Sequence, residues 1–156
     1  MILSRSDYCN GLLGNVRQDL VTKLQRVQNA AARTITRSRK RSHITSVLVK
    51  LHWLPIKARI EYKILCITYR CIKGSAPSYL TNLVKEYVPT RCFRSANNSL
   101  LSIPTAKLKT FGHRRFSFTS ASLWNDLPFF IKNSGTLSTF QSNLKTFLFR
   151  KCHPDA

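Results

Sequence analysis

The feature that most constrains the fold is the spacing of apolar residues, which recur every three or four positions in three long segments. In the first segment, residues 20–36, five apolar residues share a sector about 80° wide at 100° per residue. They are Leu20, Leu24, Val27, Ala31 and Ile35. Because such a stripe is typical of an amphipathic helix, we predict a helix here whose apolar stripe packs on the core.

Two further long helices are predicted from the same spacing and from their end signals. Residues 56–73 follow Pro55, which suits a first helical turn, and precede Gly74, which suits a left-handed stop. Their inner stripe consists of Ile56, Ile60, Ile64, Ile67 and Cys71. The last segment can be capped by Ser134 or Thr136. Its apolar positions are Leu137, Phe140, Leu144, Phe147 and Leu148.

Shorter elements are expected between the long helices. Prolines bound three short helical segments. These segments are residues 43–55, 76–89 and 113–126. The short apolar runs near residues 99–111 are consistent with a small β-hairpin, in which Pro104 excludes a continuous strand. The polar residues 90–98 predict a loop.

The fold class that follows is mainly α, with about five or six helices. At 156 residues, of which 43% are hydrophobic, the chain can bury one core. We therefore predict one small domain over residues 1–156, with ragged ends at 1–15 and 150–156.

The charge of the chain is strongly one-sided. There are 26 Lys+Arg residues and 6 Asp+Glu residues, a formal net charge of +20, whereas a typical small domain carries a net charge of about 2 to 8. So large a charge favours a polyanionic partner, and nucleic acid is the first candidate. A soluble surface rich in lysine and arginine is the simpler alternative. An anionic membrane surface is less favoured, because no basic cluster adjoins a long apolar stretch.

The cations gather on the flanks of two predicted helices, residues 20–36 and 56–73. Nine of them are candidate contacts to RNA or DNA phosphates. They are Lys23, Arg26, Arg33, Arg37, Arg39, Lys40, Arg41, Arg59 and Lys63. The run RSRKR, residues 37–41, could contact phosphates, act as a nuclear-localisation signal or simply be a solvated helix end. Trp53 and Trp124 could stack on bases, but each lies among leucines before a proline, which favours a core position.

Catalytic patterns are missing from the sequence. The six acidic residues are scattered, with no adjacent pair for a two-metal site, and no glycine-rich phosphate loop occurs. Nothing near the cysteines or histidines suggests an activated thiol or a metal centre. We predict no cofactor, no metal and no enzymatic activity.

Cysteine usage and hydropathy bear on location. The five cysteines are an odd number without a repeated C-x-x-C spacing, so we expect reduced thiols. No segment approaches the roughly 20 apolar residues of a membrane span, and no signal peptide is recognisable. The chain is expected to be soluble and intracellular without membrane association, and a nuclear location is consistent with its charge.

Several motifs together resemble one family. They are SRSDYCNGLL (4–13), LQRVQNAAAR (24–33), LHWLPIKARI (51–60), APSYL (76–80), KLKTFGHRRF (107–116), ASLWNDLP (121–128) and the STFQSNLKTFLF helix. In this order they resemble the segment that follows the reverse-transcriptase domain in proteins of LINE-type, non-LTR retrotransposons. The similarity covers nearly the whole chain.

This resemblance implies an origin in a polyprotein whose upstream parts copy RNA into DNA and nick the target. The family's polymerase motif, a Tyr-x-Asp-Asp-like pair of aspartates, has no match here, so no catalytic residue is carried over. Met1 lies just before the SRSDYCN motif, and GNVRQDL (14–20) looks shortened against the family's usual loop. Both features suggest a truncated or decaying copy.

Two functions follow as expectations. The first is a non-catalytic fragment of a retrotransposon reverse-transcriptase protein that binds RNA or DNA through basic helix faces, with low sequence specificity. The second is a decayed remnant without independent function, whose apolar faces once packed on the missing polymerase domain. A separate reverse-transcriptase domain is a further expected partner, and the sequence leaves the oligomeric state open.

Overall fold

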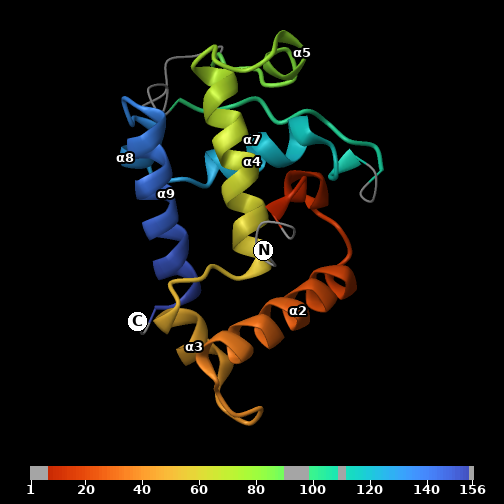
Figure 1. Cartoon of the computed structure of the whole chain (residues 1–156). Coiled ribbons are helices and arrows are strands. Elements are labelled where there is room, and N and C mark those ends of the chain that lie inside the picture. The colour runs from red at the N-terminus through yellow and green to blue at the C-terminus, as the bar shows by residue number, and fades with distance from the viewer. Residues whose placement is uncertain (1–6, 90–98, 109–111, 155–156) are drawn as a thin grey trace. The chain divides into compact units, whose positions relative to one another are not determined.

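The computed structural model describes residues 7–89, 99–108 and 112–154, and within them the chain is mainly α-helical, as predicted (Figure 1). The helical elements are the 3-10 helix η1 (Asn10–Leu13) and the α-helices α2 (Gln18–Thr36), α3 (Ile44–Lys50), α4 (Ile56–Ile72), α5 (Ser78–Thr81), α7 (Phe116–Asn125), α8 (Phe129–Lys132) and α9 (Leu137–Cys152).

The chain divides into two compact units. Unit 1 consists of residues 1–62 and 145–156, and unit 2 of residues 63–144. Helices α4 and α9 therefore each contribute residues to both units. The expectation of one domain stays a prediction.

In unit 1, α2 packs on α3 around a small apolar cluster. Ala32 of α2 meets Val47 and Leu48 of α3, and Trp53 is partly buried against them. Helix α3 ends before Pro55 because His52 takes a left-handed conformation (φ 51°) and the Trp53 N–H donates to the Leu48 carbonyl at 2.9 Å. Trp53 is therefore a packing residue, as its position among leucines indicated.

The predicted core stripe of α2 was wrong in its orientation. Leu20, Val27 and Ile35 are 45%, 55% and 59% exposed, respectively. The buried face instead contains Gln28, Ala31 and Ala32, so of the predicted stripe only Ala31 is fully buried. The helix is rotated because small alanines allow close packing on α3 and because Gln28 forms a buried hydrogen bond described below.

In unit 2, the core is built around Trp124 and Phe140. Trp124 is 1% exposed, and its ring stacks on Phe140 with centroids 5.9 Å apart. Phe140 also stacks on Tyr69 at 4.4 Å, and the Tyr69 hydroxyl donates to the Ser134 carbonyl at 2.8 Å. Trp124 is thus a core anchor, as expected, and does not offer a face to a nucleic-acid base.

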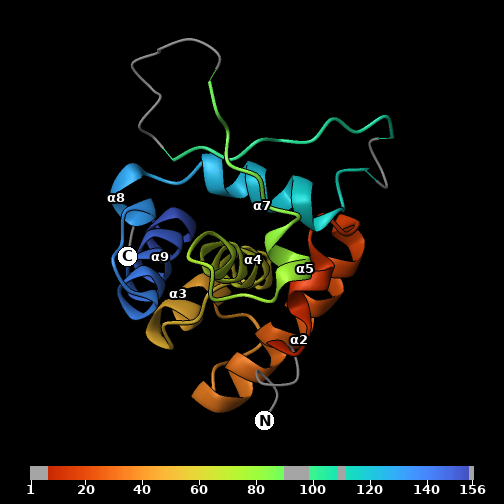
Figure 2. The ribbon, with the colours of Figure 1, turned by 90° about the horizontal axis from the view of Figure 1, so that it is seen from above.

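The β-hairpin expected near residues 99–111 is not formed within 99–108, and 109–111 lie outside the described residues. Leu101 instead makes an isolated antiparallel bridge with Glu86. The Tyr87 N–H donates to the Leu100 carbonyl at 2.9 Å, and the Ser102 N–H to the Lys85 carbonyl at 2.8 Å. Figure 2 shows the extended segment 99–108 running along α7. The residue that pairs with Leu101 therefore comes from the region predicted as a helix over 76–89, of which α5 is the helical part.

The boundaries of the two other long helices follow their local signals. The Pro55 carbonyl accepts from Arg59 N–H at 3.0 Å in the first turn of α4, and Gly74 stops the chain after α4 with φ 67°. At α9 the Thr136 hydroxyl accepts from the Thr139 N–H at 3.2 Å, so Thr136 is the cap. Both helices match their predicted starts.

The remaining differences concern short segments. Helix α7 begins at Phe116, three residues later than predicted, and α8 was not predicted at all. Of the predicted ragged ends, η1 and the last residues of α9 are helical. Within these ends, residues 1–6 and 155–156 lie outside the described residues, as does the loop predicted at 90–98.

Candidate nucleic-acid interface

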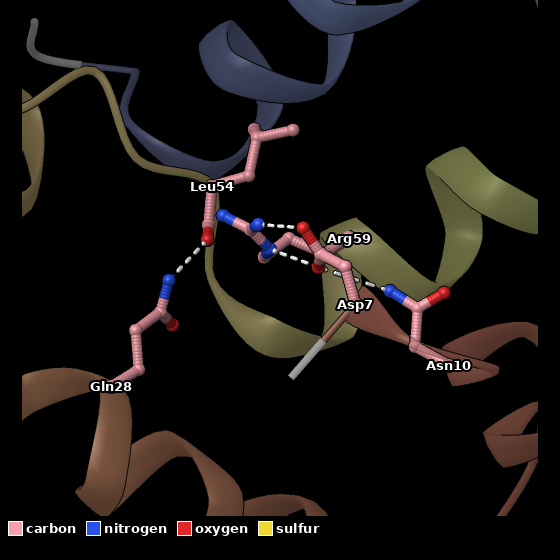
Figure 3. Close-up of polar contacts among 5 residues, drawn as sticks. All are labelled: Asp7, Asn10, Gln28, Leu54 and Arg59. Carbon is pink, nitrogen blue, oxygen red and sulfur yellow. Dashed lines mark hydrogen bonds and ion pairs between the residues drawn. The ribbon is translucent and has the colours of Figure 1, made fainter. Parts of the chain in front are cut away.

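Two glutamines fix which side of α2 faces the rest of unit 1. The Gln28 amide, 2% exposed, donates to the Leu54 carbonyl at 2.8 Å (Figure 3), while the Gln25 carbonyl oxygen accepts from the Ile56 N–H at 2.9 Å. Gln25 also donates to Gln28 at 3.0 Å. These bonds serve the backbone on both sides of Pro55, which has no N–H of its own. They turn the opposite side of α2 toward solvent.

The cations on that opposite side are exposed. Lys23 and Arg26 lie on α2, and Arg37, Arg39, Lys40 and Arg41 follow it in the connection to α3. No Asp or Glu occurs in the sequence between Asp19 and Glu61, and Asp19 itself pairs with Arg17 at 3.2 Å. This stretch of unit 1 therefore carries a positive charge without acidic residues close in the sequence to neutralise it.

The connection after α2 has a defined backbone conformation. Arg37 is left-handed (φ 50°), and the Ser38 N–H donates to the Arg33 carbonyl at 3.0 Å, an arrangement that closes helix ends. A turn follows, in which the Ser42 N–H donates to the Arg39 carbonyl at 3.0 Å. The cations of residues 37–41 are thus held on a short, hydrogen-bonded turn.

Arg33 differs from its neighbours because it is half-buried. Its Nη2 donates to the Ser42 carbonyl at 3.4 Å, and its Nε is buried without a hydrogen-bond partner. Arg33 therefore braces the turn between α2 and α3, and the described contacts give it less freedom to reach a phosphate.

Arg59 is also engaged within unit 1. Its Nε donates to Asp7 Oδ1 at 2.8 Å, and its Nη2 pairs with Asp7 Oδ2 (Figure 3). The side chain of Arg59 is 17% exposed, and Asn10 donates to the same carboxylate at 3.3 Å. A bidentate pair of this kind joins the first motif, SRSDYCN, to the helix that begins in LHWLPIKARI. Lys63 is exposed but belongs to unit 2, so it is described apart from the others.

The structural role of the motif residues was not predicted. Side-chain hydrogen bonds join Asp7 to Arg59, Gln25 to Ile56 and Gln28 to Leu54. The paired residues are 26 to 52 positions apart in the sequence. Spacing within one helix cannot reveal such partners. The available signal was that LQRVQNAAAR places two glutamines beside an apolar stripe, where a buried amide needs a partner.

Across 7–89, 99–108 and 112–154, no group of three or more His, Cys, Asp or Glu side chains could hold a metal ion. Burial raises the pKa of the Cys71 thiol, and burial together with Glu61 raises that of Cys152 against the opposing effect of Lys151 and Lys57. A raised pKa reduces the thiolate needed by a nucleophile. Cys9, Cys71 and Cys152 are thiols rather than disulfides.

In the part of the chain that the structure describes, no helix is long and apolar enough to cross a membrane. No protein-family model, curated protein or solved structure matches this chain.

Proposed function

We propose that this chain is a non-catalytic segment of a LINE-type retrotransposon reverse-transcriptase protein that binds RNA or DNA phosphates through α2 and the turn after it. The observation that carries the proposal is the run of exposed cations within residues 23–41. They are Lys23, Arg26, Arg37, Arg39, Lys40 and Arg41. Contacts between cations and phosphates supply most of the sequence-independent affinity of a protein for nucleic acid. A nuclear location and a reverse-transcriptase domain as partner belong to the same proposal.

The retrotransposon origin rests on the order of the motifs, and the contacts among them are consistent with it. Asp7 of the first motif pairs with Arg59 of LHWLPIKARI, and Gln28 of the second motif bonds to Leu54. Trp124 and Asn125 of ASLWNDLP bond instead to the backbone of Ser99 and Leu101, which lie outside these motifs. These motif residues thus have defined roles in folding.

The test is the salt dependence of binding to mixed-sequence RNA and DNA strands of about 20 nucleotides, followed by fluorescence anisotropy. Each phosphate contact to a single strand contributes about 0.7 to the log–log slope. Reversing Lys23, Arg26 and Arg37 to Glu should therefore lower the slope by about 2 and weaken binding at low salt. Arg33 is left unchanged because it braces the turn.

The matched control reverses three exposed cations of unit 2, Lys85, Lys107 and Arg114, to Glu. Both triple variants carry the same net charge, so a general loss of attraction would affect them equally. The proposal requires the α2 variant to lose distinctly more slope than the control. Undetectable or salt-independent binding by the wild-type chain would refute it.

The second candidate is a decayed remnant, and the exposed apolar residues of α2 favour it specifically. Leu20, Val27 and Ile35 are about half exposed on a helix that the pattern predicts to be packed. If a polymerase domain once covered them, the isolated chain should aggregate or melt without a cooperative transition. A cooperative transition measured by circular dichroism, together with the salt-dependent binding above, favours the binding segment.

A further inference from the structure

The exposed side of α2 has an apolar centre as well as a basic edge. At 100° per residue, Lys23, Val27, Ala30 and Thr34 fall within about 60° of one another. We call these four residues the outer ridge. All four are exposed, and Val27 is 55% exposed. Lys23 begins the ridge, Arg26 lies on one side of it, and Arg37 follows the end of the helix, so the short side chains of the ridge have cations around them.

Short side chains at the centre allow close approach of the helix axis to a partner. Ala30 carries one methyl group, and the Thr34 hydroxyl donates to the Ala30 carbonyl at 3.0 Å. The hydroxyl proton of Thr34 is therefore used within the helix, and its methyl group is the apolar contact available to a partner, beside the acceptor sites of the hydroxyl oxygen. The outer ridge thus presents three apolar groups, from Val27, Ala30 and Thr34, in line along the helix.

We propose that α2 lies in the major groove of double-stranded DNA, with the apolar groups of the outer ridge against thymine methyl groups and the marginal cations on phosphates. This proposal rests on the proposed function and names its substrate. An α-helix about 10–12 Å in diameter fits the B-DNA major groove, which is about 12 Å wide. Apolar contact with thymine methyl groups is a recognised use of alanine and threonine side chains.

Duplex RNA is the less suitable form of nucleic acid for this ridge. The major groove of A-form RNA is deep and narrow, and side chains cannot read it. Uracil also lacks the methyl group that the ridge would contact. Phosphate binding alone does not distinguish RNA from DNA, so a preference for duplex DNA is a consequence of the ridge rather than of the charge.

Charge makes a second copy of this chain an unsuitable occupant. A symmetric pair joined through the outer ridge would bring Arg26 and Arg37 of one copy near the same residues of the other. With a net charge of +20 on each chain, such a pair would repel itself. The basic margin is complementary to phosphate.

The experiment measures binding of the full chain to three duplexes of one thymine-rich sequence, about 16 base pairs long. The first is DNA, the second is the same DNA with deoxyuridine for thymidine, and the third is RNA. We expect DNA to bind about tenfold or more tightly than RNA. Deoxyuridine should weaken binding by about fourfold for each methyl group that is contacted.

The matched variants are Val27→Ala on the ridge and Ile35→Ala away from it on the same helix. Both truncate an exposed aliphatic side chain of the same helix, so both should leave the fold intact. Val27→Ala should weaken binding to thymine DNA and reduce the penalty for deoxyuridine, whereas Ile35→Ala should change neither. This comparison tests the contact itself rather than the stability of the helix.

The results separate this inference from the proposed function. Equal, steeply salt-dependent binding of the DNA and RNA duplexes would overturn the groove inference while leaving phosphate binding intact. A deoxyuridine penalty that is the same in wild type and Val27→Ala would also overturn it. Self-association in sedimentation that Val27→Ala abolishes would identify the ridge as a protein interface instead. Failure to bind any nucleic acid would refute both proposals.

Discussion

Gln28 is the buried polar residue on which the orientation of α2 depends most directly. It is 2% exposed, donates to the Leu54 carbonyl at 2.8 Å and accepts from Gln25 at 3.0 Å. In Gln28→Ala the Leu54 carbonyl would lose this buried partner, which typically costs about 1 to 3 kcal/mol. We expect the free energy of unfolding, measured by urea denaturation, to fall by about 2 kcal/mol.

A suitable control is Gln18→Ala, which truncates an exposed glutamine in the first turn of the same helix. Its effect should stay within about 0.5 kcal/mol. Equal stability of the two variants would mean that the hydrogen bond to Leu54 does not hold α2 in place.

Cys71 makes the stability of the chain depend on pH in the alkaline range. It is 2% exposed, and burial raises the pKa of its thiol. The unfolded chain therefore loses this proton at a lower pH than the folded chain, and the stability contributed by the protonated thiol declines as pH rises above about 8.5. Below that pH the contribution is fully present.

The measurement compares wild type with Cys71→Ala between about pH 7 and about pH 10. The variant should be less stable at neutral pH, because it loses packed volume. The gap should narrow as pH rises, since only the wild type loses the contribution of Cys71. Lysines and Cys152 titrate in both proteins, so their contributions cancel in the difference between the two free energies of unfolding. A constant gap would contradict the prediction.

At the scale of elements, α7 holds the extended segment of unit 2 through the side chains of Asn125 and Trp124. The Asn125 amide donates to the Leu101 carbonyl and its oxygen accepts from the Leu101 N–H, both at 2.9 Å. Trp124 donates to the Ser99 carbonyl at 2.9 Å. In Asn125→Ala we expect hydrogen exchange at residues 85–87 and 99–102 to accelerate about tenfold or more, because local opening loses two hydrogen bonds.

Asn133→Ala provides the comparison, since Asn133 is exposed at the end of α8 in the same unit. It should leave exchange at residues 85–87 and 99–102 unchanged. If exchange in Asn125→Ala accelerates throughout unit 2 instead of in these segments, Asn125 supports the whole core rather than the segment.

The sequence predicts elements whose ends are local and misses those whose partners are distant. The starts of α4 and α9 follow from Pro55 and Thr136, and the stop after α4 from Gly74. The orientation of α2 does not follow from its own pattern, because its rotation depends on hydrogen bonds to residues 54–56. The same limit explains the hairpin: Leu101 pairs with Glu86, not with a neighbour across Pro104.

The candidate interface was predictable to a similar extent. Lys23, Arg26 and the cations after Arg37 are exposed because they lie away from the face that packs on α3. Arg59 lies on the basic flank in the sequence pattern, but its pair with Asp7, 52 positions away, could not be read from helical spacing. The outer ridge was hidden for the same reason, since the pattern assigned Val27 to the core.

At the scale of the whole molecule, each compact unit contains one tryptophan. Trp53 lies in unit 1 and Trp124 in unit 2. Trp53→Phe leaves Trp124 as the only tryptophan, so its fluorescence reports the unfolding of unit 2 alone. Hydrogen exchange of the α2 and α3 amides reports unit 1 in the same protein. Unfolding of the two units can therefore be followed separately.

We expect the two units to unfold together in one transition. Helices α4 and α9 each contain residues of both units, and their continuous backbone hydrogen bonding makes it costly to melt one half of either helix alone. The urea midpoint of Trp124 fluorescence should then coincide with the midpoint for global exchange of α2 and α3. Separate midpoints would show that the predicted single domain is two independently stable parts, and α2 could then bind DNA while unit 2 is unfolded.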